Sequence, residues 1–316
     1  MRKSLLLCVL VWVGCDDTRV GADGAIPMSD GGTVDGGDDS GTVRPMSPLV
    51  DPMCTDGMYA EALPDPDVDI TDLETGFGTA DPEDFLEAIL SRRYAMGLEV
   101  VVGGRSGFIN CVEYFYSDRS SAERTYQQLS VIVHECGHVF DIGLSSGASS
   151  TYAINATPLR LTCSGGDTTS RGGTTFARSR IRGDTFQGMN PTDSYAGVYL
   201  DGNPDDMVFE GGDQGFNSVL EETTQYVNSL AVSYAFTNEH AARGGSVSER
   251  DGILTFLWYV MRYLRMARTD YPAAYEHLLN GDGGCWRNAI LTVWGRAWLY
   301  LDVTEGMSHL GIRDAA

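Results

Sequence analysis

The feature that most constrains the fold of this chain is a pair of histidines spaced four positions apart inside an apolar run. The motif reads His134-Glu135-Cys136-Gly137-His138, with Val131 to Val133 before it and Val139 and Phe140 after it. The run is compatible with a helix, and helical spacing puts both imidazoles on one face, where they can share a metal ion. Glu135 projects about 100° further round, close enough to contact a metal-bound water. The sequence therefore predicts a half-buried helix that carries an H-E-x-x-H zinc site.

A catalytic zinc site of this kind needs a third protein ligand and leaves its fourth position to water. A second long helix is expected over residues 216–236, and it contains the adjacent acids Glu221 and Glu222. On a helical wheel Glu221 lies in line with a polar stripe, whereas Glu222 lies nearer the apolar side. A ligand glutamate can occupy either environment, so the wheel leaves both residues open.

The string from His134 to Asp141 has the form H-E-x-G-H-x-x-D and resembles the active-site run of lethal-factor-like gluzincin metallopeptidases. It lacks the G-x-x-H continuation that marks metzincins. In gluzincins the ligand glutamate commonly stands four residues before an acidic or amide residue, and Glu221 and Gln225 fit that spacing. The resemblance therefore implies a zincin-like fold and metallopeptidase activity, with His134, His138 and Glu221 as zinc ligands and Glu222 as the alternative to Glu221.

The chemistry implied is hydrolysis of peptide bonds with one zinc ion and with Glu135 as the general base. Asp141 lies one turn beyond His138 and is expected to accept a hydrogen bond from an imidazole, and Gln225 is expected beside the ligand glutamate. The developing oxyanion needs a further donor, for which the candidates are Tyr226, Tyr195, Tyr199 and His240. The rival expectation is a non-catalytic surface lipoprotein that binds a protein or a glycan and carries an accidental or degenerate zinc motif.

The N-terminus predicts export. Arg2 and Lys3 precede an apolar run over residues 5–13, which is too short to span a bilayer and is typical of a signal peptide. The run ends in Gly14-Cys15, which resembles a bacterial lipobox and implies Cys15 as the lipid anchor at the cell envelope; an ordinary secretory signal is the alternative. Residues 16–60 are rich in Asp and Gly and predict a flexible tether. The catalytic domain is then expected over residues 61–316.

The charge of the chain limits the classes of molecule that it can bind, and its cysteines indicate which disulfides can form. The chain has 316 residues, a formal net charge of −22 and a single lysine, Lys3, which argues against a nucleic-acid partner. The resemblance to metallopeptidases implies a protein or peptide substrate as the partner. Cys136 is expected to stay unpaired on the core side of its helix. Two disulfides of undecided pairing are then expected among the four other cysteines after the leader: Cys54, Cys111, Cys163 and Cys285.

The expected fold class is α+β, dominated by helices. A helix should start at Asp81-Pro82 and extend to about residue 96, and the helix with the zinc motif should cover residues 120–141. Residues 98–102 and 108–116 are rich in β-branched and aromatic residues and predict a strand pair. A long Gly- and Ser-rich insertion is expected over 143–215, followed later by three amphipathic helices over 250–268, 271–279 and 286–303.

Overall fold

The computed structural model describes residues 59–79, 81–155, 159–165, 176–182, 194–206, 208, 210–239 and 249–310. All of them belong to the second of two units into which the chain divides, Met46–Ala316. The described part is dominated by helices and contains one small antiparallel sheet, which confirms the expected helix-dominated α+β class. The predicted signal peptide, the anchor Cys15 and nearly all of the predicted tether lie outside the described residues.

The histidine motif lies on a long helix, α5 (Ala122–Leu144), close to the predicted bounds. Ser121 caps the helix: its side chain accepts a hydrogen bond from the backbone N–H of Arg124 and so satisfies one free donor of the first turn. Its apolar positions recur at helical spacing and are buried in the core: Leu129, Ile132, Val133, Cys136 and Val139. The burial of this face fixes which side of the helix carries the two histidines.

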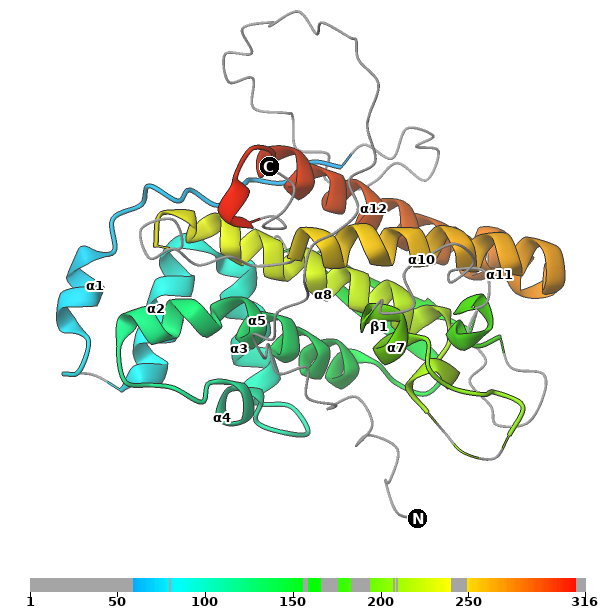
Figure 1. Cartoon of the computed structure of the whole chain (residues 1–316), viewed down its shortest axis with the longest axis horizontal. Helices are drawn as coiled ribbons and strands as arrows, with labels where there is room; N and C mark the ends of the chain where they lie inside the picture. Colours follow the sequence, from blue (N-terminus) through cyan, green and yellow to red (C-terminus); the bar gives the residue numbers. More distant parts are fainter. Residues whose placement is uncertain are drawn as a thin grey trace, which may run out of the picture. The chain divides into compact units, whose positions relative to one another are not determined.

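The second predicted helix is α8 (Phe216–Ala235), and it occupies the centre of the described fold. It packs against α5 on one side and against α10 (Glu249–Asp270) and α12 (Cys285–Val303) on the other (Figure 1). Because α8 is covered on both sides, most of its residues are buried, 15 of 20. Any polar side chain on α8 therefore needs a partner inside the protein.

The helix predicted after Asp81-Pro82 is confirmed as α2 (Pro82–Arg93), with Asp81 capping its start through the N–H of Glu83. The strand pair predicted over 98–102 and 108–116 is wrong, because these residues form α3 (Ala95–Arg105) and α4 (Cys111–Phe115). Val100 and Val101 of α3 are buried where this helix packs against α5, and packing of that kind outweighs intrinsic strand preference. Gly104 permits the approach, since a Cβ there would lie 2.5 Å from the backbone oxygen of Cys136.

The predicted insertion over 143–215 contains regular structure immediately after α5. β1 (Ser149–Asn155) pairs with β2 (Leu159–Ser164) in an antiparallel hairpin, with Thr151 opposite Thr162. Short helical turns follow further along: η1 (Arg178–Ile181), α7 (Ser194–Tyr199) and η2 (Gly211–Asp213). The hairpin packs against both α5 and α8 and so brings the insertion to the helix that carries the histidines.

The three C-terminal helices are confirmed as α10, α11 (Pro272–Asn280) and α12, and short turns complete the described chain. These turns are α1 (Thr71–Gly76), η3 (Gly281–Gly284) and η4 (Ser308–Leu310). None of the described helices combines the length and the apolar character that a membrane-spanning segment requires.

Two disulfides link the described elements, and one of them corrects the expectation for Cys136. Cys136 is buried on the core side of α5 as predicted, but it is bonded to Cys111 at the start of α4, with the two Cα atoms 5.2 Å apart. The second bond joins Cys163 on β2 to Cys285 at the start of α12. The prediction that Cys136 is unpaired was wrong, because a helical wheel describes one helix alone. It cannot show that the start of α4 packs beside Cys136. Cys54 lies outside the described residues.

Candidate metal centre

Three side chains from α5 and α8 form a group that could hold a metal ion: His134, His138 and Glu222, whose ligand atoms all lie within 4.8 Å of one another. Glu222 Oε2 is 3.7 Å from His134 Nε2 and 3.4 Å from His138 Nε2. The same oxygen is buried and has no hydrogen-bond partner in the described structure. A buried carboxylate oxygen without a partner is costly, and a shared cation would satisfy it. Two imidazoles and one carboxylate are also a donor set that zinc uses.

The two acids of α8 have different positions, and the geometry reverses the sequence-based preference for Glu221. Both Glu221 oxygens approach His138 Nδ1, at 2.8 and 2.6 Å, and not the Nε2 atom that faces Glu222. A hydrogen bond at Nδ1 fixes the imidazole tautomer and leaves Nε2 free to bind a cation. Glu222 therefore belongs to the group that could hold a metal ion, whereas Glu221 is hydrogen-bonded to the opposite nitrogen of His138.

The charges around His138 favour a cation. Burial alone would lower the pKa of His138, but the carboxylates of Glu221 and Glu222 outweigh it and hold that pKa well above its usual value. For Glu222, burial opposes ionisation, and the neighbouring His138 and His134 nevertheless lower its pKa. The two carboxylates thus act together on the imidazole from opposite sides, a distribution that stabilises positive charge between them.

Gln225 connects Glu221 to Asp141. Its Nε2 donates to Glu221 Oε1 at 3.1 Å and to Asp141 Oδ2 at 2.9 Å. Asp141 also accepts a hydrogen bond from the backbone N–H of Ala153 on β1, at 3.0 Å. Asp141 therefore acts on His138 through Gln225 and Glu221, and in the described structure it makes no direct hydrogen bond to an imidazole. Gly137 leaves room for this arrangement, since a Cβ there would lie 1.9 Å from Gln225 Oε1.

The same chain of hydrogen bonds continues into the core through residues that the sequence did not identify. Asn228 donates to Gln225 Oε1 at 2.9 Å and accepts from Arg296 Nη1 at 2.8 Å. Arg296, on α12, in turn donates to Glu61 Oε2 at 3.0 Å. The available signal was Arg296 itself, a charged residue within the otherwise uncharged stretch 288–301. This network links the orientation of Gln225 to the start of the described chain.

His134 is also oriented through its second nitrogen. Its Nδ1 lies 3.0 Å from the hydroxyl oxygen of Ser229, one helical turn beyond Gln225 on α8. Its ring packs edge-on against Tyr226, with the ring centroids 4.8 Å apart. Both candidate ligand histidines are therefore held through Nδ1, and their Nε2 atoms face Glu222.

Tyrosines on α7 and α8 lie beside this group. The hydroxyls of Tyr199 and Tyr226 are 3.2 Å apart, and the rings of Tyr195 and Tyr226 are 6.1 Å apart. Burial raises the pKa of Tyr199 and of Tyr226, so both hydroxyls stay protonated and can donate hydrogen bonds at neutral pH. Of the candidate donors named from the sequence, these three tyrosines gather at the metal group. His240 lies outside the described residues.

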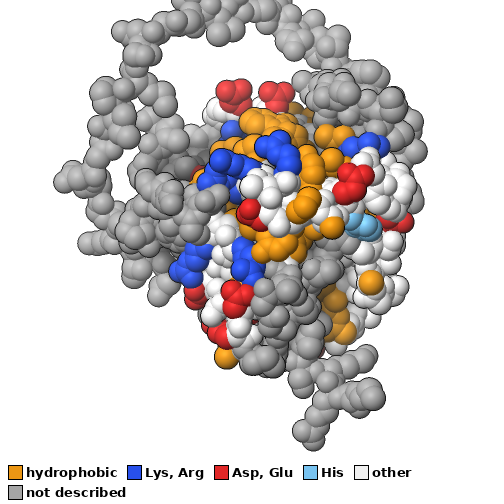
Figure 2. All heavy atoms as spheres, turned by 90° about the vertical axis from the view of Figure 1, so that its right-hand side faces the viewer, with side chains coloured by type: hydrophobic (Ala, Val, Ile, Leu, Met, Phe, Trp, Pro, Cys, Tyr) orange, Lys and Arg blue, Asp and Glu red, His pale blue; other side chains and the backbone are white. Residues whose placement is uncertain are grey.

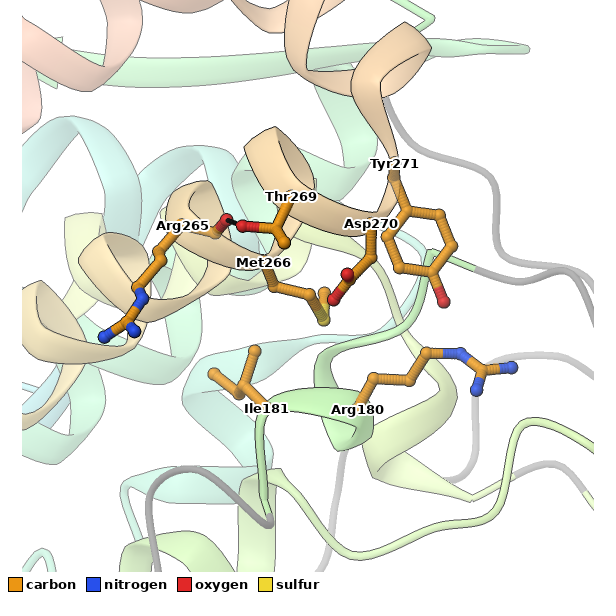
Figure 3. Close-up of a pocket in the computed structure, with 7 residues that line it drawn as sticks. All are labelled: Arg180, Ile181, Arg265, Met266, Thr269, Asp270 and Tyr271. Carbon is orange, nitrogen blue, oxygen red and sulfur yellow. Dashed lines mark hydrogen bonds between the residues drawn. The ribbon is translucent and has the colours of Figure 1, made fainter.

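Two surface hollows lie apart from the metal group, along α10 and α12. Figure 3 shows one between η1 and the end of α10, lined by Arg180, Ile181, Met266, Asp270 and their neighbours. A second hollow, lined by apolar side chains and arginines of α10, α11 and α12, includes Leu264, Ile290 and Arg287. The space-filling view of the molecule shows hydrophobic side chains bordered by basic ones (Figure 2). Neither hollow includes any member of the metal group.

Comparison of the chain with protein-family models, with curated proteins and with solved structures found no match.

Proposed function

We propose that this chain is an exported zinc-dependent metallopeptidase of gluzincin type. The observation that carries the proposal is Glu222 Oε2, a buried carboxylate oxygen without a hydrogen-bond partner that faces the Nε2 atoms of His134 and His138. A zinc ion bound by these three side chains would supply Lewis acidity, which makes water more acidic and polarises a scissile carbonyl.

Glu135 is the proposed general base. It directly follows His134 on α5 and its side chain is half-buried, next to the metal group rather than within it. Its carboxylate accepts the proton of the attacking water and passes it to the nitrogen of the departing amine. The protonated hydroxyls of Tyr199 and Tyr226 are the proposed donors to the oxyanion that develops on the substrate carbonyl.

The proposed substrate is a protein or peptide, and the proposed place of action is outside the cytoplasm, with Cys15 as the lipid anchor at a bacterial envelope. The leader sequence supports export, and the two disulfides are consistent with an oxidising compartment.

The test combines metal content with cleavage. The purified protein should contain one zinc ion per chain by elemental analysis, and His134→Ala should lose it. A fluorogenic peptide library should be cleaved by the wild type, whereas Glu135→Gln should retain zinc and lose at least about a hundredfold in rate, the usual share of a general base. Glu123→Gln is the matched control, because Glu123 is an exposed acid in the first turn of the same helix.

The outcomes separate this proposal from its rival. Metal-free protein of unchanged stability would contradict a zinc site altogether. Zinc-loaded protein that cleaves no peptide would contradict the enzyme and favour the non-catalytic binding lipoprotein. Cleavage that is as fast in Glu135→Gln as in the wild type would contradict Glu135 as the general base.

A further inference from the structure

A buried guanidinium lies beside the metal group without a carboxylate partner. Arg178, the first residue of η1, has only 3% of its surface exposed. Its Nε donates to the carbonyl oxygen of Gly211 at 3.1 Å, and its Nη1 approaches the hydroxyl of Ser218 at 3.3 Å. Both acceptors are uncharged. The Nη2 group makes no hydrogen bond within the described part of the chain.

The other two buried arginines of the described structure are paired with acids. Arg93 Nη1 lies 2.6 Å from a Glu239 carboxylate oxygen, and Arg296 Nε lies 3.0 Å from one of Glu61. Burying a charge without such a partner costs several kcal/mol. Burial lowers the pKa of Arg178, but an arginine remains protonated at any physiological pH. The charges of Glu222 and Glu221 act against that shift, but neither carboxylate forms a direct ion pair with Arg178 in the described structure.

Two independent contacts place this cation at the metal group. Ser218, which Nη1 approaches, stands one helical turn before Glu222 on α8. The Cζ atom of Arg178 also lies over the ring of Tyr199, 5.5 Å from its centroid, and the Tyr199 hydroxyl reaches that of Tyr226. Arg178 thus contacts Tyr199, one of the proposed oxyanion donors, and Ser218, one turn before the carboxylate of Glu222, whose charge also acts on it.

We infer that Arg178 forms a subsite that binds a carboxylate of the substrate next to the metal group. The inference rests on the proposed peptidase function and names the substrate class, peptides that present a carboxylate near the scissile bond. An arginine suits this task because its planar fork can donate two parallel hydrogen bonds to one carboxylate, here from Nη1 and Nη2. The incoming carboxylate supplies the counter-ion that the fold leaves out.

A peptide can present this group in two ways, as its C-terminal carboxylate or as an Asp or Glu side chain. The test uses zinc-loaded Glu135→Gln protein, so that peptides bind without turnover, and measures dissociation constants by fluorescence polarisation. One peptide pair differs only in a free or amidated C-terminus, and a second pair differs only in Glu or Gln beside the scissile position. Binding of the carboxylate member should be at least about tenfold tighter in one pair, the worth of a hydrogen-bonded ion pair.

Variants then assign the preference to the guanidinium. Arg178→Gln should bind both members equally, with the affinity for the neutral peptide and the zinc content unchanged. Arg178→Lys keeps the charge without the fork and should give an intermediate preference. Arg180→Gln is the control, because Arg180 lies two residues away on the same turn, ion-paired with Asp205 and extended beside the neighbouring hollow (Figure 3).

The result that overturns the inference is a wild-type preference below twofold in both peptide pairs, or a preference that survives in Arg178→Gln. Loss of zinc in both Arg178 variants would also overturn it, since the residue would then be a structural support. Failure of the proposed function looks different, because carboxylate-dependent binding would then remain in Glu135→Gln protein while the wild type cleaves no peptide.

Discussion

The different positions of Glu221 and Glu222 predict opposite roles for two adjacent acids. Glu222→Gln removes the only carboxylate among the three ligand atoms that face one another, so zinc should no longer survive dialysis. Glu221→Gln leaves those three atoms in place and alters only the partner of His138 Nδ1, which both Glu221 oxygens approach at 2.8 and 2.6 Å.

The size of the Glu221 effect follows from its position behind the histidine. Loss of a group that orients a metal-bound histidine typically weakens metal affinity by about 10- to 100-fold, equivalent to roughly 1.4–2.7 kcal/mol. Gln225 donates to the same carboxylate at 3.1 Å and should hold the new amide in place through its oxygen, which favours the lower part of that range.

Competition for zinc with a chromophoric chelator measures both effects on one scale, with Glu123→Gln as the unchanged reference and thermal unfolding as the check that each variant folds. Loss of zinc in Glu221→Gln together with retention in Glu222→Gln would refute the reasoning. Equal effects in both variants would refute the division of roles, because each acid would then contribute in the same way.

Further predictions concern stability. Gly137→Ala should lower the free energy of unfolding by about 2–4 kcal/mol in urea titrations, because its Cβ would displace the Gln225 amide and break the buried hydrogen bonds of that amide. Gly143→Ala is the control and should leave the free energy of unfolding unchanged, because Gly143 is an open position on α5. Cys285→Ser should cost up to about 5 kcal/mol, because its disulfide closes 122 residues, yet the zinc content should persist, as the bond touches no ligand; loss of zinc would contradict this. Burial raises the pKa of Glu249 to about 7, above its unfolded value of 4.5, so its contribution to stability is complete below pH 4.5 and is lost as the pH rises through 7. Glu249→Gln should therefore be more stable than the wild type at pH 8 and should flatten the dependence between pH 5 and pH 8, and an unchanged slope would contradict this.

The helices illustrate where sequence reasoning succeeds. The spacing of apolar residues around His134 and His138 located α5 and oriented its histidines, because the period of 3.6 residues is a local property of one segment. The same reasoning found α2, α8 and the three C-terminal helices. It failed at α3, where valines beside two glycines led to a strand prediction. The helix at this position is stabilised by packing against α5, a segment that local sequence patterns do not take into account.

The sequence by itself determined which candidate metal ligands this protein carries: two histidines and a glutamate within five residues of one helix, with two further acids on a second helix. Tertiary structure alone decided which acid faces the imidazoles. Neighbouring residues of a helix project about 100° apart, and only the packing of α8 on α5 determines which of the two directions points at the histidines. It also decided the disulfide partner of Cys136 and the place of Arg178 beside Ser218 and Tyr199. Each of these depends on contacts between segments far apart in the chain, and only the packed fold fixes such contacts.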